Sequence, residues 1–192
     1  MSSRLVLTCC LLLVGFLGVA QPGKPLPAGY LRWSAVRRLQ VADFQLKLRS
    51  KNNLRQSIGN IGLQMDGNAY DLLSKRVNAV VQNLFNTSAS YLDSAGREDM
   101  NEQLRYMQTL WDISEVAARR LRKELRANAR RIALIGKPDT GELFRLASEE
   151  ASRRHIQYAD ETNYGLYLDK QETWERQLAQ ELAELAAFAL PD

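Results

Sequence analysis

The chain has almost no cysteine: it has two in 192 residues, Cys9 and Cys10, both close to its start. They lie within an apolar run at 5–19 that follows one basic residue, Arg4, and precedes the small residue Ala20. A basic start, an apolar centre and small residues at the cleavage position define a secretory signal peptide, which we predict over residues 1–20. Cleavage after Ala20 leaves a disulfide-free chain, secreted and extracellular, although small secreted proteins usually depend on disulfides.

Two other interpretations of this start are less favoured. A membrane anchor needs about 20 apolar residues, and the run at 5–19 is shorter. A bacterial lipoprotein carries its modified cysteine after the apolar run, whereas Cys9 and Cys10 lie inside it. We therefore predict no transmembrane segment once the signal peptide is removed.

Histidine is equally scarce, with His155 as the single one in the chain. Transition-metal sites usually take several His or Cys ligands, so we predict no metal and no cofactor. Ser152 lies three residues before His155, but a catalytic triad also needs an orienting carboxylate and oxyanion donors, which nothing in the sequence nominates. Asp139-Thr-Gly resembles the tripeptide of aspartic proteases, yet those enzymes pair two such aspartates and this chain has one copy. We predict no catalytic residues and a protein that is not an enzyme.

Proline is absent between Ala28 and Lys137, since the five prolines lie at positions 22, 25, 27, 138 and 191. Proline costs about 3 kcal/mol inside a helix, so this spacing permits long helices. We predict an all-α fold: an elongated antiparallel bundle of about five amphipathic helices in a single domain at 30–190. A proline-rich, extended lead-in at 21–29 precedes it.

The strongest helical signal is a heptad pattern of the coiled-coil type in the third predicted helix. Its seam residues are spaced 4-3-4-3: Met100, Leu104, Met107, Trp111, Ser114, Ala118, Leu121, Leu125, Asn128, Ile132 and Ile135. Such a helix is roughly 55 Å long, so at least two other helices should lie alongside it. Further helices are predicted at 30–58, 68–85 and 140–159, and Asp139 is expected to cap the last of these. A final helix is predicted after Gly165 and before Pro191, with an apolar stripe of Trp174, Leu178, Leu182, Leu185 and Ala189. Residues 44–49 also alternate with a period of two, which is typical of a strand.

Charge is unevenly distributed along the chain. Residues 21–138 carry 20 Lys and Arg against 10 Asp and Glu, and residues 139–192 carry 5 against 12. Within the third predicted helix, seven bases lie off the seam: Arg119, Arg120, Arg122, Lys123, Arg126, Arg130 and Arg131. Such a basic face binds polyanions such as sulfated glycans or anionic lipid headgroups. The alternative, which we favour on sequence, is that the acidic C-terminal helices neutralise it. Nucleic acid is not expected, because the chain has no recognition motif.

Asn86-Thr-Ser is the only N-glycosylation sequon in the chain. We predict that it lies in an exposed break after a helix and that Asn86 carries a glycan if the source is eukaryotic. The alternative is an unused sequon in which Asn86 ends that helix.

A secreted, cysteine-free chain of about five amphipathic helices resembles, in architecture, the exchangeable apolipoprotein bundles such as the insect apolipophorins. That resemblance implies a carrier of lipid or of a small apolar ligand. Glycines at 59, 62 and 67, together with Trp33, Trp111 and Trp174, instead favour a fixed core. We therefore predict a secreted, non-enzymatic helical protein that acts by binding or interaction, with an unknown extracellular protein or an apolar ligand as its partner. The carrier and the polyanion-binding protein are the alternatives.

Overall fold

The computed structural model describes residues 26–47, 57–93 and 100–190, and its fold is mixed α/β. The predicted all-α bundle of about five helices is wrong, because a three-stranded antiparallel sheet precedes three long helices. The strands are β1 (Tyr30–Arg32), β2 (Ile61–Met65) and β3 (Val81–Asn86), and the α-helices are α1 (Ala69–Leu73), α2 (Met100–Ile135), α3 (Thr140–Thr162) and α4 (Leu168–Glu184). Short 3-10 helices are η1 (Val41–Asp43), η2 (Val77–Val80), η3 (Thr87–Ala89) and η4 (Ala186–Phe188). The predicted signal peptide lies outside the described residues, as does the lead-in before residue 26.

The sheet has the order β1-β3-β2, with both outer strands antiparallel to β3. Leu31 of β1 and Ile61 of β2 are both paired with Phe85 of β3. Phe85 therefore lies at the centre of the sheet, where its side chain has no exposed area.

The helix predicted at 68–85 is wrong except for its first turn. Asn68 caps α1, since its Oδ1 accepts hydrogen bonds from the backbone N–H of Tyr70 at 2.8 Å and of Asp71 at 3.2 Å. The chain then leaves the helix at Ser74 and forms β3. Four of the six β3 residues are buried, because the strand is central and α2 covers it. The consecutive residues Asn83, Leu84 and Phe85 are all buried, which interrupts the alternation of a half-exposed strand. The apolar spacing is therefore easily taken for that of a helix.

The helix predicted at 30–58 is also wrong wherever residues are described. Its first residues form β1, and the alternating segment that begins at Phe44 is extended without being a named strand. There the N–H of Gln45 donates to the carbonyl of Thr87 at 2.9 Å, and the N–H of Leu46 donates to that of Ser90 at 3.0 Å. The period of two thus marked an extended chain, which pairs with the segment after β3.

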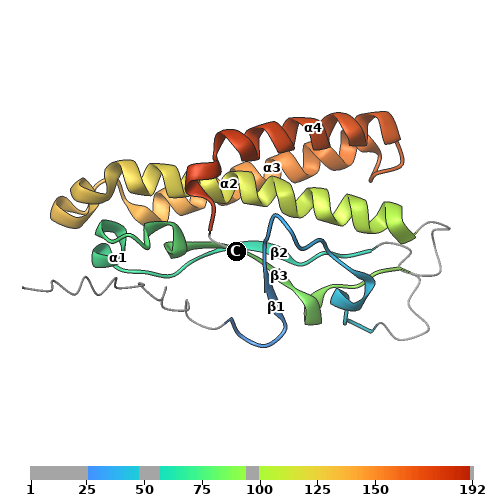
Figure 1. The fold of residues 1–192 in the computed structure, drawn as a ribbon, viewed down its shortest axis with the longest axis horizontal. Helices are drawn as coiled ribbons and strands as arrows, with labels where there is room; N and C mark the ends of the chain where they lie inside the picture. Colours follow the sequence, from blue (N-terminus) through green and yellow to red (C-terminus); the bar gives the residue numbers. More distant parts are fainter. Residues whose placement is uncertain (1–25, 48–56, 94–99, 191–192) are drawn as a thin grey trace, which may run out of the picture.

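α2 and α3 follow the sequence pattern closely, whereas α4 ends at Glu184, so Leu185 and Ala189 of the predicted last helix lie beyond it. The heptad seam has the same bounds as α2, and the cap predicted for the fourth helix is confirmed, since Asp139 Oδ1 accepts from the N–H of Glu142 at 2.8 Å. α3 ends at Asn163, which adopts the left-handed conformation with φ of 47°. α4 then runs antiparallel to α3 (Figure 1).

α2 is the central element of the molecule. In Figure 1 the sheet and α1 lie on one side of it, and α3 and α4 lie on the other. One hydrophobic cluster surrounds its N-terminal half and contains Phe85, Trp111, Tyr158 and Trp174. A second cluster surrounds its C-terminal half, where Leu125 packs against residues of α1, η2 and β3. Every residue from Trp111 to Arg119 is consequently buried.

Candidate functional site

The seven predicted anion-binding residues all lie on α2, but the structure divides them into two groups. Arg119 and Arg122 are buried, with 5% and 0% of their surface exposed. Both contact the carboxylate of Glu115, with N–O distances of 3.0 Å from Arg119 and 2.8 Å from Arg122. These two arginines form part of the core and are not available to an external anion.

The same two arginines hold distant segments of the chain against α2. Arg122 donates to the carbonyl of Val81 in β3 at 3.0 Å and to that of Phe188 in η4 at 3.1 Å. Arg119 donates to the carbonyl of Leu182 at 2.7 Å, and its guanidinium lies 5.1 Å from the ring centre of Trp33. Burial lowers the pKa of Arg122, against the opposing effect of Glu115.

Arg120 links the three long helices at the surface. It pairs with Glu150 of α3 and, at 2.8 Å, with Glu181 of α4. Arg154 of α3 also binds Glu181, at 2.8 Å. Burial raises the pKa of Glu181, but its hydrogen bonds with Arg154 and the nearby arginine charges outweigh burial and hold it below the ordinary value. At this position the acidic helices neutralise the basic run, as we favoured on sequence.

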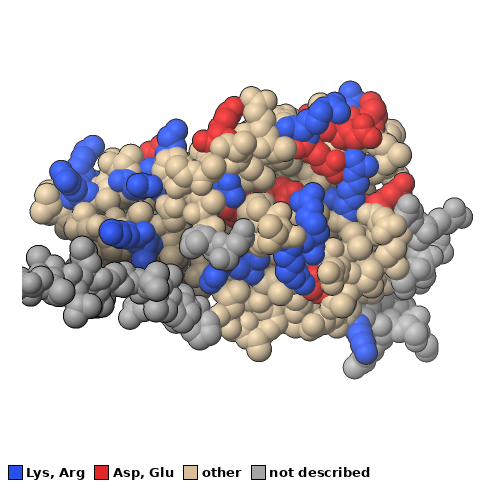
Figure 2. Space-filling model, in the orientation of Figure 1, with Lys and Arg blue, Asp and Glu red and all other residues tan. Residues whose placement is uncertain are grey.

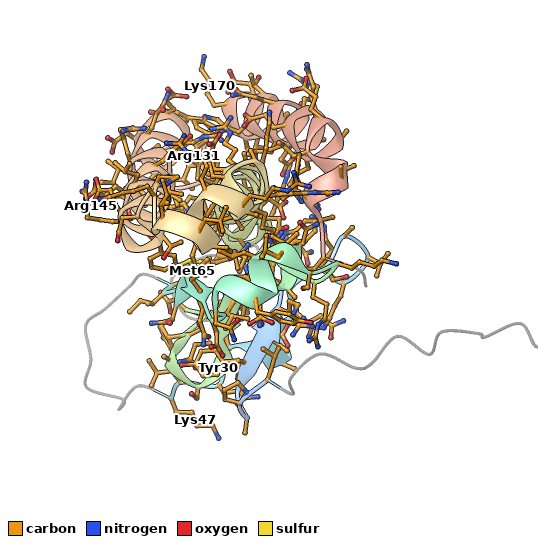
Figure 3. The ribbon with its side chains drawn as sticks, turned by 90° about the vertical axis from the view of Figure 1, so that its left-hand side faces the viewer. Tyr30, Lys47, Met65, Arg131, Arg145 and Lys170 are labelled. Carbon is orange, nitrogen blue, oxygen red and sulfur yellow. The ribbon has the colours of Figure 1, made fainter. Side chains whose placement is uncertain are left out.

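The other four bases, Lys123, Arg126, Arg130 and Arg131, are exposed on the last third of α2, and we call them the distal basic surface. Among the described residues none of the four has a carboxylate within 4.0 Å. Figure 2 shows that Lys and Arg predominate at the left end of the molecule, where α2 ends, whereas both signs are mixed at the right. Figure 3 looks onto this end and shows Arg131 in the helical layer above the sheet.

α2 contains a second repeating pattern that was not predicted from the sequence. Gln108, Asp112, Glu115, Arg119 and Arg122 follow a 4-3-4-3 spacing of their own, parallel to the apolar seam, and all five are buried. We call them the buried polar stripe. The signal available in the sequence was this heptad repeat of polar residues beside the apolar seam. Two such parallel repeats indicate a helix that is covered on both sides.

Asp112 is the acceptor at the N-terminal end of this stripe. Its Oδ1 accepts from Trp33 Nε1 at 2.7 Å and from Gln108 Nε2 at 2.8 Å, and its Oδ2 accepts from Arg38 at 3.2 Å. Burial raises the pKa of Asp112, although these hydrogen bonds oppose the shift. Gln108 Oε1 in turn accepts from the N–H of Leu39 at 2.9 Å. The stripe therefore fixes the chain between β1 and η1 against α2.

His155 does not form the hydrogen bond that a serine nucleophile requires. Ser152 donates to the carbonyl of Ser148 at 2.9 Å, and the hydroxyl near His155 Nε2, at 3.0 Å, is that of Ser114. The same Nε2 lies 2.8 Å from the carbonyl of Leu110. A carbonyl only accepts, so Nε2 carries the proton and Ser114 Oγ accepts from it. A general base needs the opposite arrangement. Burial lowers the pKa of His155.

Asn86 ends β3 and caps η3, so the predicted helix before it is absent. Its Oδ1 accepts from the N–H groups of Ser88 and Ala89 at 3.1 and 3.2 Å, and its Nδ2 donates to the hydroxyl of Tyr30 at 3.1 Å. The side chain is half-buried, while Ser88 is exposed. Glycosylation of Asn86 stays a prediction.

An open hollow of about 620 Å³ lies along the outer face of α3, lined by Phe144, Ser148, Ile156 and neighbouring polar residues. Within the described ranges, no three His, Cys, Asp or Glu side chains are grouped as metal ligands would be. In the same ranges, no helix has the length and apolar character to cross a membrane.

Comparisons of the chain with protein families, with curated proteins and with solved structures found no match.

Proposed function

We propose that this is a secreted, non-enzymatic protein that binds an anionic macromolecular surface through the distal basic surface. The observation that carries the proposal is the density of unpaired charge there. Lys123, Arg126, Arg130 and Arg131 lie within nine residues of one helix, all exposed and without an acidic partner among the described residues. Closely spaced cations raise the local concentration of anions and steer them to the surface.

The rest of α2 supports this assignment. A rigid site is more precise than one on a loop, and α2 is held by both hydrophobic clusters along its length.

The position of the proton on His155 gives no support to a nucleophilic enzyme. A carrier would hold its ligand in an enclosed apolar cavity, whereas the hollow along α3 is open and includes the Arg145–Glu149 ion pair.

Heparin chromatography tests the proposal, with heparin as the polyanion. We expect the protein to be retained at about 0.15 M salt, where exposed charges are screened over about 8 Å. The triple variant Arg126→Gln, Arg130→Gln, Arg131→Gln should elute at markedly lower salt, because it loses most of the distal basic surface.

The matched control removes three exposed bases elsewhere, with Arg153→Gln, Lys170→Gln and Arg176→Gln on α3 and α4. Both variants have the same formal charge, so a difference between them locates the binding surface. Equal shifts for the two variants, or no retention of the unaltered protein at about 0.15 M salt, would refute the proposal.

A further inference from the structure

The end of α2 combines the distal basic surface with exposed aliphatic side chains. Leu134 is 83% exposed and Ile135 is 65% exposed, and they are the only large apolar side chains of α2 that are exposed. We call this pair the apolar tip. The other large apolar side chains of α2 are buried or half-buried, so this pair differs from the rest of its helix.

The apolar tip lies where the chain turns. Gly136 follows it with φ of +65°, and a side chain added there would meet open space. Lys137 and Asp139 come next and are exposed. Figure 1 shows the end of α2 and the start of α3 forming one extremity of the molecule. This position lets the apolar tip reach a flat surface before the rest of the fold does.

The charges are placed one turn behind the apolar tip. Arg130 precedes Leu134 by four residues, and Arg131 precedes Ile135 by four, so each arginine lies about one helical turn further from the end. Lys137 adds a cation just beyond it. This order suits the boundary of an anionic bilayer, where aliphatic groups enter the acyl region and basic side chains stay among the headgroups.

Most of the acidic side chains near the end of α2 already have hydrogen-bond or ion-pair partners. Asp139 caps α3, and Glu142 and Glu149 are paired with Arg145. Glu124 is exposed on α2 beside the distal basic surface. The cations of the distal basic surface and Lys137 therefore outnumber the acid that faces them.

Helix α1 adds the same chemistry beside α2. Tyr70 and Leu73 are 76% and 54% exposed, and the exposed bases Lys75 and Arg76 follow them directly. α1 packs on α2, and Figure 3, which looks onto this end, shows α1 below the end of α2. Two neighbouring helices thus present apolar and basic side chains at one extremity.

From this arrangement we infer that the anionic partner is a lipid surface and that Leu134 and Ile135 insert between its headgroups. The inference rests on the proposed function, since it names the source of the anionic groups. A soluble sulfated glycan has no apolar layer and would gain nothing from the apolar tip.

The experiment compares two probes: heparin, and vesicles of phosphatidylcholine with or without about 30% phosphatidylserine, at about 0.15 M salt. The test variant is Leu134→Ser with Ile135→Ser. The control is Leu166→Ser with Leu168→Ser, two exposed leucines at the turn between α3 and α4. Circular dichroism during heating checks that both variants fold.

We expect the unaltered protein to sediment with the anionic vesicles and not with phosphatidylcholine alone. Serine at 134 and 135 should weaken vesicle binding by about tenfold or more, the scale of losing burial of an aliphatic side chain, and leave heparin elution unchanged. The control should behave as the unaltered protein does.

Two kinds of failure are distinguishable. Retention on heparin without vesicle binding, or vesicle binding that is unchanged in the test variant, would overturn this inference and leave the proposed function standing. Equal binding to vesicles with and without phosphatidylserine would also overturn it. Absence of retention on heparin would overturn the proposed function and, with it, this inference.

Discussion

The substitution Glu115→Gln should be among the most destabilising conservative changes in this protein. It removes the negative charge that faces Arg119 and Arg122, and it keeps the size of the side chain. Side-chain exposure is 3% for Glu115, 6% for Arg119 and 0% for Arg122, so water cannot replace the lost carboxylate. Removing one partner of a buried ion pair costs about 3–5 kcal/mol. A domain of this kind has about 5–15 kcal/mol of unfolding free energy in total.

Urea unfolding followed by circular dichroism measures the loss, provided that the dependence on denaturant stays constant. Glu149→Gln is the matched control, because Glu149 pairs with Arg145 at the surface and both side chains are more than half exposed. An exposed pair contributes about 0–1 kcal/mol. If Glu115→Gln lost no more free energy than Glu149→Gln does, the buried ion cluster would not be a determinant of stability.

A second variant separates the buried charge from the lost contact. Combining Glu115→Gln with Arg122→Met removes one of the two uncompensated cations. The double variant should lose less free energy than the sum of the two single variants, with a coupling of about 0.5–3 kcal/mol between residues in one network. Strict additivity would contradict the electrostatic explanation.

Three further predictions concern other parts of the chain. Leu125→Ala should cost about 2–5 kcal/mol of unfolding free energy, because Leu125 has no exposed area. Arg126→Ala, at the exposed neighbouring residue, should change the free energy by no more than about 0.5 kcal/mol. Urea unfolding compares the two variants, and similar losses would contradict the assigned faces of α2. Burial lowers the pKa of His155, so the unfolded chain takes up a proton more readily and stability should fall as the pH drops below about 6.5. His155→Gln should lose less free energy than the unaltered protein between about pH 7.5 and about pH 5.5, and a larger loss would reverse the sign argued here. Mass spectrometry of secreted protein should find Gln21 at the N-terminus, and a peptide containing Cys9 and Cys10 would disprove cleavage after Ala20.

The sequence predicted the local periodicity of the helices well and the pairing of distant β-strands poorly. The bounds of α2 follow from the seam that ends at Ile135, and the start of α3 follows from Asp139, because helices and caps depend on residues close in the chain. The sheet depends on Leu31, Ile61 and Phe85 meeting, although long segments of chain separate them. No local pattern specifies that meeting, so the sequence pattern predicts a helix where β3 lies.

The candidate site shows the same division. The basic run was visible in the sequence, but its partition depends on what packs against each face of α2. Arg122 and Arg126 are one turn apart, and yet one has no exposed area and the other is exposed. The difference arises from β3 and η4, which cover Arg122 through contacts with Val81 and Phe188. Neither element extends along α2 as far as Arg126. The exposure of Ile135 was hidden for a related reason, since the seam includes this residue and does not reveal where the neighbouring elements stop.

The central position of α2 has a consequence for how the molecule opens and how ligands are detected. Its two halves supply both hydrophobic clusters, so neither cluster can open without disturbing a helix that the other one holds. The amide hydrogens around Val116 should therefore exchange with solvent only when the whole chain unfolds, as one cooperative unit. Any ligand that binds either extremity of the folded protein must then raise its overall melting temperature. A thermal-shift screen therefore reports on binding at either end of the molecule, including ends for which no ligand is yet proposed.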